Sequence, residues 1–310
     1  MRIGLIPGVN RESVELNAAI EQVVEAETGG FDSIWFPQIS SFGFDALTLI
    51  SLAGAQTSRI EMGTAVIPTF PIHPLVLAKQ ALTTQVACGG RLTLGLGLSH
   101  RPSIEDTMGL SYQHPARHMR EYLTVVRSLI DGGRSDFEGS TYNVRADLSV
   151  PESAPCPIII AALAPRMLRL AGEMADGTVT WMAGLKTIGS HIVPRIQDAA
   201  QAAGRPAPRV VVGLPVAVTD DPSGAREMAA RTFERYGQLT NYRRMLDIEG
   251  VEGPSEVAVV GNEAQVEEQL RAFAGAGATD FVAAILPVGE NQAESASRTW
   301  QLLASLVGKL

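Results

Sequence analysis

The sequence predicts an α/β fold in which parallel strands alternate with helices, namely a single (β/α)8 or TIM barrel with insertions. Eight short apolar runs recur along the 310 residues, and amphipathic stretches separate them. Two of these runs, Ile60–Ile67 and Leu92–Leu98, are apolar on both faces, which is typical of strands in a parallel sheet that helices cover. One barrel of this kind accounts for a chain of this length.

The predicted elements follow one another in strict alternation. The strands are expected at Ile3–Pro7, Ser33–Pro37, Ile60–Ile67, Leu92–Leu98, Pro157–Ala162, Gly177–Trp181, Val210–Val218 and Asp280–Leu286. The helices are expected at Ser13–Thr28, Phe44–Gln56, His73–Ala87, Pro115–Ile130, Pro165–Ala175, Leu185–Ala203, Ser223–Gln238, Glu263–Gly275 and Gln292–Val307. Glycines support several helix ends, because glycine readily adopts the left-handed conformation that ends many helices; they stand at Gly29-Gly30, Gly132-Gly133 and Gly275-Ala276-Gly277.

Two segments do not belong to the strands and helices of a minimal (β/α)8 barrel. Arg134–Cys156 is expected to form a hairpin or loop insertion before the fifth strand, and Leu239–Val260 a second insertion after the seventh. Long insertions in a compact domain are often lids or binding loops, and a solvated surface loop is the alternative for each. We find no repeat, low-complexity tract or second domain, so residues 1–310 are expected to form one domain.

Composition and charge limit the partners. The net charge of −8 argues against nucleic acid or an anionic membrane as the main partner. Cys88 and Cys156 stand far apart without metal-ligand neighbours, which favours a reduced, cytoplasmic setting. A strand is expected directly after Met1, which leaves no room for a signal peptide, and the longest apolar stretch, around Ile158–Ala164, is too short to span a bilayer.

Several phrases of the sequence occur in the order in which one known family has them. They are Gly30–Trp35, Gly63–Val66, His73–Ala78, Gly90–Gly97, His118–Leu123 and Ala171–Gly177. In these phrases the chain resembles the bacterial luciferase-like superfamily of (β/α)8 oxidoreductases, and within it the branch that uses the deazaflavin coenzyme F420. The resemblance implies an enzyme that transfers hydride between that cofactor and a small organic substrate. It also makes a homodimer and a separate cofactor-reducing enzyme possible partners.

Barrel enzymes bind ligands at the carboxyl ends of their strands. The third strand ends at Ala65, Val66 and Ile67. The resemblance implies a non-proline cis peptide between Ala65 and Val66, beneath the central ring of the flavin.

The fourth strand ends at Leu98, Ser99 and His100. Its Gly95-Leu96-Gly97 lacks the third glycine of a dinucleotide motif, so these glycines are expected to thin the barrel interior and let a ring approach closely. Ser99 and His100 would then lie beside the deazaflavin and supply hydrogen bonds or a proton. A purely structural histidine is the alternative.

The fifth strand ends in small residues and a helix start. Free N–H groups at a helix start attract phosphate, and the resemblance places the phosphate tail of the cofactor near this turn. The candidate cofactor-binding residues here are Ala161, Ala162, Leu163, Ala164, Pro165 and Arg166. For Arg166, and for Arg169 one turn later, a solvated helix face is the alternative.

The chain departs from one branch of the family after the second strand. Deazaflavin-dependent sugar-phosphate dehydrogenases carry an Asp-His pair there, whereas this chain has Gln38-Ile39. Isoleucine cannot act as a general base, so reduction of an activated double bond or imine is favoured over alcohol oxidation by that route. Gln38 and His100 remain the candidates for orienting the substrate and handling protons. Phe42, Phe44 and Trp181 could wall an apolar pocket or pack in the core.

The alternatives differ in cofactor and in chemistry. The nearest is a two-component monooxygenase that uses FMN and oxygen, and another is a flavin-binding protein without catalysis. A non-redox barrel would usually show a lysine or paired carboxylates at strand ends, and neither stands out. No metal is expected: His114 and His118 are four residues apart, but Pro115 starts a helix between them and no third ligand stands nearby.

Overall fold

The computed structural model describes residues 1–7, 15–39 and 42–310. Eight strands of these residues close a parallel ring in which each strand pairs with the next and the last pairs with the first. The TIM barrel predicted from the sequence is therefore confirmed. In ring order the strands are β1 (Arg2–Ile6), β2 (Ser33–Phe36), β3 (Glu61–Thr64), β5 (Leu92–Gly97), β8 (Ile158–Ala161), β9 (Gly177–Trp181), β10 (Arg209–Val218) and β12 (Asp280–Ile285).

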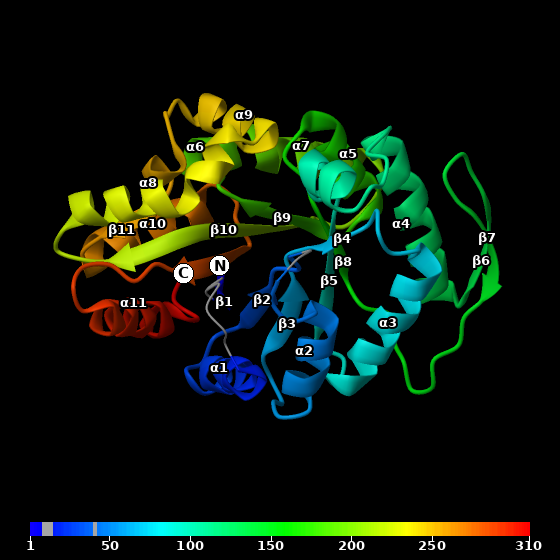
Figure 1. The fold of residues 1–310 in the computed structure, drawn as a ribbon, viewed down its shortest axis with the longest axis horizontal. Coiled ribbons are helices and arrows are strands. Elements are labelled where there is room, and N and C mark those ends of the chain that lie inside the picture. Colours follow the sequence, from blue (N-terminus) through cyan, green and yellow to red (C-terminus); the bar gives the residue numbers. More distant parts are fainter. Residues whose placement is uncertain (8–14, 40–41) are drawn as a thin grey trace.

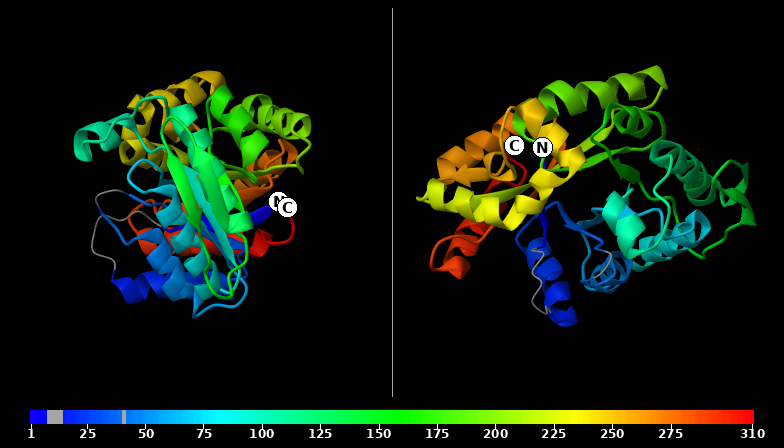
Figure 2. Two further views of the ribbon diagram at one scale, coloured as in Figure 1. Left: turned by 90° about the vertical axis from the view of Figure 1, so that its right-hand side faces the viewer. Right: turned by 45° about the horizontal axis from the view of Figure 1, so that its top comes forward.

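Helices surround this ring (Figures 1 and 2). They are α1 (Leu16–Thr28), α2 (Ala46–Gly54), α3 (Pro74–Ala87), α4 (Pro115–Gly132), α5 (Pro165–Met174), α6 (Leu185–Thr187), α7 (Val193–Ala202), α8 (Pro222–Gln238), α9 (Thr240–Glu249), α10 (Glu263–Gly275) and α11 (Gln292–Leu306). Short helical turns lie at Ser103–Thr107, Ile188–Ile192 and Pro254–Glu256. The predicted start of the first helix, Ser13, lies outside the described residues.

Local sequence explains several helix starts. Proline occupies the first turn of α3, α4 and α5, where its missing N–H has no intrahelical partner to lose. The Asp45 carboxylate accepts the Thr48 N–H at the start of α2, and Asn262 and Gln265 bond reciprocally at the start of α10.

Four further strands lie outside the ring. The strand β4 (Ile67–Pro68) pairs with β5, and β11 (Val259–Gly261) pairs with β10. The strands β6 (Arg134–Glu138) and β7 (Asn143–Asp147) form an antiparallel hairpin, which confirms a hairpin in the first insertion. The Glu121 carboxylate of α4 holds the hairpin turn, since it accepts N–H groups from Ser140, Thr141 and Tyr142 at 2.7–3.1 Å.

The barrel interior has an apolar middle and a charged amino end. Ile6, Trp35, Ile159, Val179, Val211 and Val282 form the apolar cluster. At the amino ends of the strands, Arg209 bonds to Asp280 at 2.6 Å and to Glu61 at 2.9 Å, and Arg2 bonds to Glu61 at 2.7 Å. Burial alone would lower the pKa of the Arg209 guanidinium, but the two carboxylates raise it. This network closes the end of the barrel opposite the expected site.

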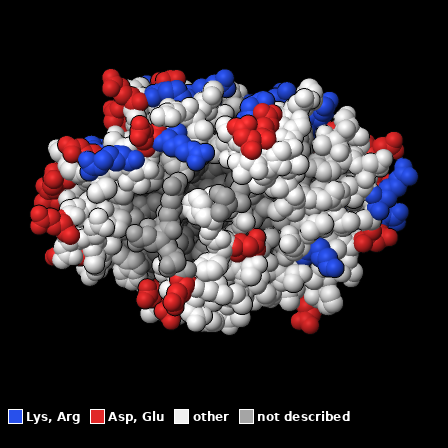
Figure 3. Space-filling model, viewed as in Figure 1, with Lys and Arg blue, Asp and Glu red and all other residues white. Residues whose placement is uncertain are grey.

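The two termini lie side by side, and the Met1 amino group donates to the Leu310 carbonyl (Figures 1 and 2). Acidic and basic side chains are interspersed toward the edge of the face in Figure 3, and no large area of one sign is visible on it. Within the described ranges, no helix is long and apolar enough to cross a membrane.

Candidate active site

The carboxyl ends of the strands form an apolar floor. Ala65, Val66, Trp181 and Ala284 are partly buried and pack on top of the apolar cluster inside the barrel. The Ala65–Val66 peptide is cis, as the resemblance implied, so that prediction is confirmed. Small and apolar side chains at the mouth leave a surface that a planar ring can contact.

The glycines of β5 have a different role from the one predicted. A Cβ atom on Gly95 would overlap the Thr64 carbonyl oxygen, and one on Gly97 would overlap the Val66 side chain. The prediction that these glycines leave room for a ring was therefore wrong, because the segment Thr64–Val66 of the chain itself fills that room. The Thr64 hydroxyl donates to the Gly95 carbonyl and accepts the Gly95 N–H, each at 2.8 Å.

The segment after the floor is fixed against α4. Ile67 pairs with Leu96 in β5, and the Thr69 N–H donates to the Gly97 carbonyl at 2.9 Å. Thr69 Oγ1 and His118 Nε2 share a hydrogen bond of 2.9 Å, and the Phe70 ring stacks on the His118 ring at 3.9 Å. Burial lowers the pKa of His118 to about 4, so this imidazole is neutral at pH 7.

The loop after β5 brings Ser99 and His100 to the mouth. Ser99 has φ 58°, in the left-handed region that non-glycine residues rarely adopt, and its carbonyl accepts the Tyr112 hydroxyl at 3.4 Å. Leu98, Ser99 and His100 are all partly buried. Burial lowers the pKa of His100, and the charge of Arg235 lowers it further. The imidazole is therefore neutral at neutral pH and has a ring nitrogen that can accept a proton.

The turn after β8 is built as a helix start without a side-chain cap. Ala164 precedes α5, and no side chain caps it within the part of the chain that the structure describes. The turn is held from behind, because the Ala162 N–H donates to Thr178 Oγ1 at 3.2 Å and the Leu163 carbonyl is 2.8 Å from His191 Nε2. Beside it lies a hollow of about 300 Å3, lined by Leu163, Ala164, Pro165, His191, Asn241, Arg244, Met245, Asp247 and Ile248.

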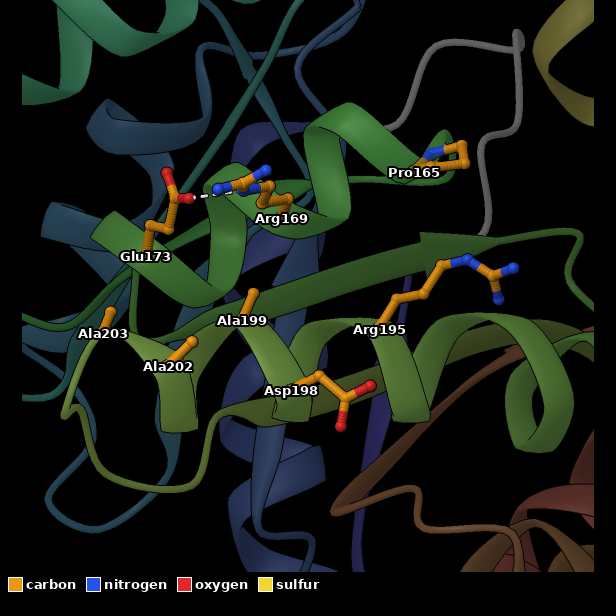
Figure 4. A pocket seen from close by; sticks show the side chains of 8 residues that line it. All are labelled: Pro165, Arg169, Glu173, Arg195, Asp198, Ala199, Ala202 and Ala203. Carbon is orange, nitrogen blue, oxygen red and sulfur yellow. Dashed lines mark hydrogen bonds and ion pairs between the residues drawn. The ribbon is translucent and has the colours of Figure 1, made fainter.

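A larger hollow of about 570 Å3 lies outside the barrel between α5 and α7 (Figure 4). Arg169 points along it and donates to Glu173 at 2.7 Å, and alanines of α7 form its floor. Arg169 is thus engaged in an ion pair along its own helix. Arg166 is exposed and has no partner among the described side chains. Because most of its lining residues belong to α5 and α7, outside the ring of strands, we do not assign the active site to it.

Gln38 has a structural contact that the sequence did not reveal. Its side-chain Oε1 accepts the Ala46 N–H at 2.7 Å, at the first residue of α2. Its Nε2 has no partner among the described residues and is free to donate. Phe44 lies close to this helix start and is 41% exposed. It therefore does not pack in the core, and it can line a pocket or lie on the surface.

Three residues near the mouth were missed from the sequence. Phe233 and Tyr236 of α8 contact Trp181 at the end of β9, and Tyr242 of α9 contacts His100. The clue was the gathering of three aromatic residues within ten positions in a chain with 5% aromatic content. Phe233 and Tyr236 lie in the predicted helix Ser223–Gln238 and Tyr242 in the predicted insertion Leu239–Val260, so the three were not expected to form one cluster.

Comparison with known proteins agrees with this geometry. The model of the luciferase-like monooxygenase family matches residues 4–280. The chain belongs to this family. An F420-dependent glucose-6-phosphate dehydrogenase of Microbacterium testaceum is 30% identical over 270 residues, which is 83% of this chain and 79% of that protein. The predicted resemblance to the luciferase-like family and its F420-dependent branch is confirmed. The prediction of an oxidoreductase enzyme is confirmed with it.

Two solved structures share the luciferase-like fold along nearly the whole chain. An F420-dependent secondary alcohol dehydrogenase with an F420–acetone adduct has a TM-score of 0.77 at 18% identity, and covers 97% of this chain and 98% of that one. The oxygenating constituent of 3,6-diketocamphane monooxygenase of Pseudomonas putida, with FMN, has a TM-score of 0.76 at 20% identity, and covers 100% and 97%. At these identities the likeness concerns the fold alone.

Proposed function

We propose that this luciferase-like protein is an F420-dependent oxidoreductase that transfers hydride between the deazaflavin and a small, apolar organic substrate. Support for the deazaflavin comes from the relative that is 30% identical and is named for F420, whereas the FMN protein is similar at a sequence identity of 20%. The alternative is an FMN-dependent two-component monooxygenase.

The observation that carries the proposal is the placement of two unlike surfaces on either side of β5. The apolar floor at Ala65 and Val66 follows β3, and the uncapped helix start at Ala164 follows β8; both strands pair with β5. A planar ring with an anionic tail requires such a pair of surfaces, because the ring needs apolar contact and the tail needs N–H donors.

The residues present fit the cofactor. Its ring would lie on Ala65, Val66 and Ile67, beside Leu98, Ser99 and His100. Its phosphate would lie at the turn formed by Ala161, Ala162, Leu163, Ala164 and Pro165, where Arg166 adds positive charge. When bound in its reduced form, the cofactor supplies a hydride, which carries two electrons, and the substrate takes up one proton to balance the reduction.

His100 and Gln38 are proposed to handle protons and orientation. His100 is neutral, partly buried and beside the proposed ring position, so its imidazole can pass a proton between substrate and water. The Nε2 of Gln38, which has no partner among the described residues, can donate to a substrate oxygen or nitrogen, while its Oε1 accepts the Ala46 N–H of α2. Because neither Gln38 nor Ile39 can act as a general base, we propose reduction of an activated double bond or imine.

The remaining expectations stay part of the proposal. We propose that residues 1–310 act as one domain in the cytoplasm, without nucleic acid or membrane as a partner. A homodimer and a separate enzyme that reduces the cofactor complete the proposed assembly.

An anaerobic assay with reduced F420 tests the proposed reaction. Substrate-dependent oxidation of reduced F420 without oxygen is expected, and loss of the signal in His100→Ala but not in Arg145→Gln, in the β6–β7 hairpin, would agree with the assigned role of His100. Turnover that requires oxygen, FMN and a flavin reductase would instead support the monooxygenase.

A further inference from the structure

Five rings form a continuous chain of contacts across part of the barrel mouth. We call His100, Trp181, Phe233, Tyr236 and Tyr242 the ring cluster. Trp181 meets Phe233 at 5.8 Å and Tyr236 at 6.0 Å, Tyr236 meets Tyr242 at 5.1 Å, and Tyr242 meets His100 at 5.7 Å between ring centroids. The interplanar angles of these pairs range from 57° to 85°, so the rings meet mainly edge to face, a favourable arrangement.

One end of the ring cluster is part of the floor. Trp181 packs with Ala65 and Val66 on the apolar cluster inside the barrel. A Cβ atom on Gly213 would come within 3.2 Å of both the Trp181 ring and the Ile6 side chain, so the indole lies across the barrel interior. The other end is His100 after β5. In the ring of strands β5 and β9 are separated by β8, so the ring cluster links the ends of two strands that are not neighbours.

The insertion at 239–260 holds this cluster in place. Tyr242 is carried by α9, and the Glu249 carboxylate at the end of α9 accepts the Lys186 N–H at 3.1 Å and the Thr187 N–H at 2.7 Å. These are the first N–H groups of α6, directly after β9. The side chain of Glu249 fills the space beside Gly184, where a Cβ would overlap it. The helix α9 is therefore anchored to the barrel, and Tyr242 is held with it.

The ring cluster is uncharged at neutral pH. Burial raises the pKa values of the Tyr236 and Tyr242 phenols, and burial lowers that of His100. Arg235 is the cation whose charge acts on both His100 and Tyr236, and its own side chain is exposed. A phosphate placed against these rings would lose its hydration without gaining a buried cationic partner.

We propose that the ring cluster is the wall that holds the substrate, and that it selects an uncharged, ring-bearing organic compound over a sugar phosphate. Aromatic edges and faces gain most from a planar apolar group, which they remove from water. This inference rests on the proposed function, because the wall faces a substrate whose other side meets the cofactor. It assigns the substrate class to Trp181, Phe233, Tyr236 and Tyr242, and makes α9 the element that sets specificity.

Ligand-observed saturation-transfer NMR on the full chain with F420 tests the inference. Benzylideneacetone, an uncharged enone with one aromatic ring, and glucose 6-phosphate are the two probes. We expect the enone to bind and the sugar phosphate not to compete with it. Phe233→Leu and Tyr242→Leu should each weaken binding of the enone by about tenfold or more, while F420 affinity stays within about twofold. The matched control is Phe137→Leu in the β6–β7 hairpin, which should change neither affinity.

Tighter binding of glucose 6-phosphate than of the enone would overturn the inference, most clearly if Arg235→Gln abolished that binding. Unchanged enone affinity in both cluster variants would also overturn it. The proposed function can fail on its own. If F420 does not bind, but the enone binds and the cluster variants weaken its binding, the proposed wall is supported and the proposed cofactor is wrong. If F420 binds and the enone does not, the proposed cofactor is supported and the proposed substrate wall is wrong.

Discussion

His118 sets part of the acid sensitivity of the fold, because it is buried as a neutral imidazole between Thr69 and Phe70. His118 is 3% exposed. This burial lowers the pKa of its imidazole from 6.5 to about 4, although the charge of Glu121 acts in the opposite direction. The unfolded chain takes up this proton near pH 6.5 and the folded chain does not until about pH 4. Stability from this group is therefore complete above pH 6.5 and is lost as the pH falls toward 4.

The magnitude follows from the shift. Since a tenfold change in a proton affinity corresponds to about 1.4 kcal/mol, the lowering of the His118 pKa from 6.5 to about 4 is worth about 3 kcal/mol. His118→Gln removes the titrating group and can keep a hydrogen bond to Thr69. The variant should be less stable by about 1–2 kcal/mol at neutral pH, because the ring stack is lost. Between about pH 7 and about pH 4.5 it should lose about 2 kcal/mol less than the original chain.

Urea unfolding followed by circular dichroism at both pH values measures this difference. Carboxylates with lowered pKa values that do not act on His118, such as Glu173 and Glu263, contribute in both proteins and cancel in the comparison. Thr69→Val is the control. It removes the hydrogen-bond partner of His118 and should lower the free energy of unfolding by about 1 kcal/mol, but the imidazole still titrates. If His118→Gln loses as much stability on acidification as the original chain, the burial argument for His118 is refuted.

Three further predictions concern packing and charge. Gly95→Ala places a methyl group against the Thr64 carbonyl and should cost about 3 kcal/mol or prevent folding; thermal unfolding measures it, and an unchanged midpoint would contradict the close approach. Arg209→Met leaves the buried Asp280 carboxylate with the longer ion pair to Arg2 (3.4 Å) in place of the 2.6 Å pair, and should cost about 3 kcal/mol in urea unfolding, with unchanged F420 affinity in the folded fraction. Glu121→Gln weakens three N–H bonds to the hairpin and should cost about 1–3 kcal/mol. Hydrogen exchange should then rise in residues 134–147 and not in the barrel strands, whereas a uniform rise would argue against a local role.

The barrel could be predicted because its strands are apolar on both faces, a local property of the sequence. All eight predicted strands overlap the observed strands, and Gly177–Trp181 agrees at both ends. The floor at Ala65 and Val66 was placed by resemblance, and the cis peptide agrees with it. These features depend on residues that are close together in the chain.

The features that were missed depend on partners far apart in the sequence. The helix α9 buries only Met245 and Leu246, so its apolar periodicity is too weak to distinguish it from a loop. The glycines of β5 were given the wrong role because a glycine pattern indicates missing side chains but not which atoms fill the space. The cap that Gln38 provides for α2 likewise appears only when the two backbones are placed together.

The central claim is that the mouth of this luciferase-like barrel holds the deazaflavin ring on Ala65–Val66 and its phosphate at the turn before α5. Titration of the purified chain with F420, FMN and FAD, followed by calorimetry, tests it most directly. The claim predicts that F420 binds at least about tenfold more tightly than FMN, and that Ala162→Leu in the turn weakens it by about tenfold or more. Tighter binding of FMN, or an F420 affinity that Ala162→Leu leaves unchanged, would contradict it.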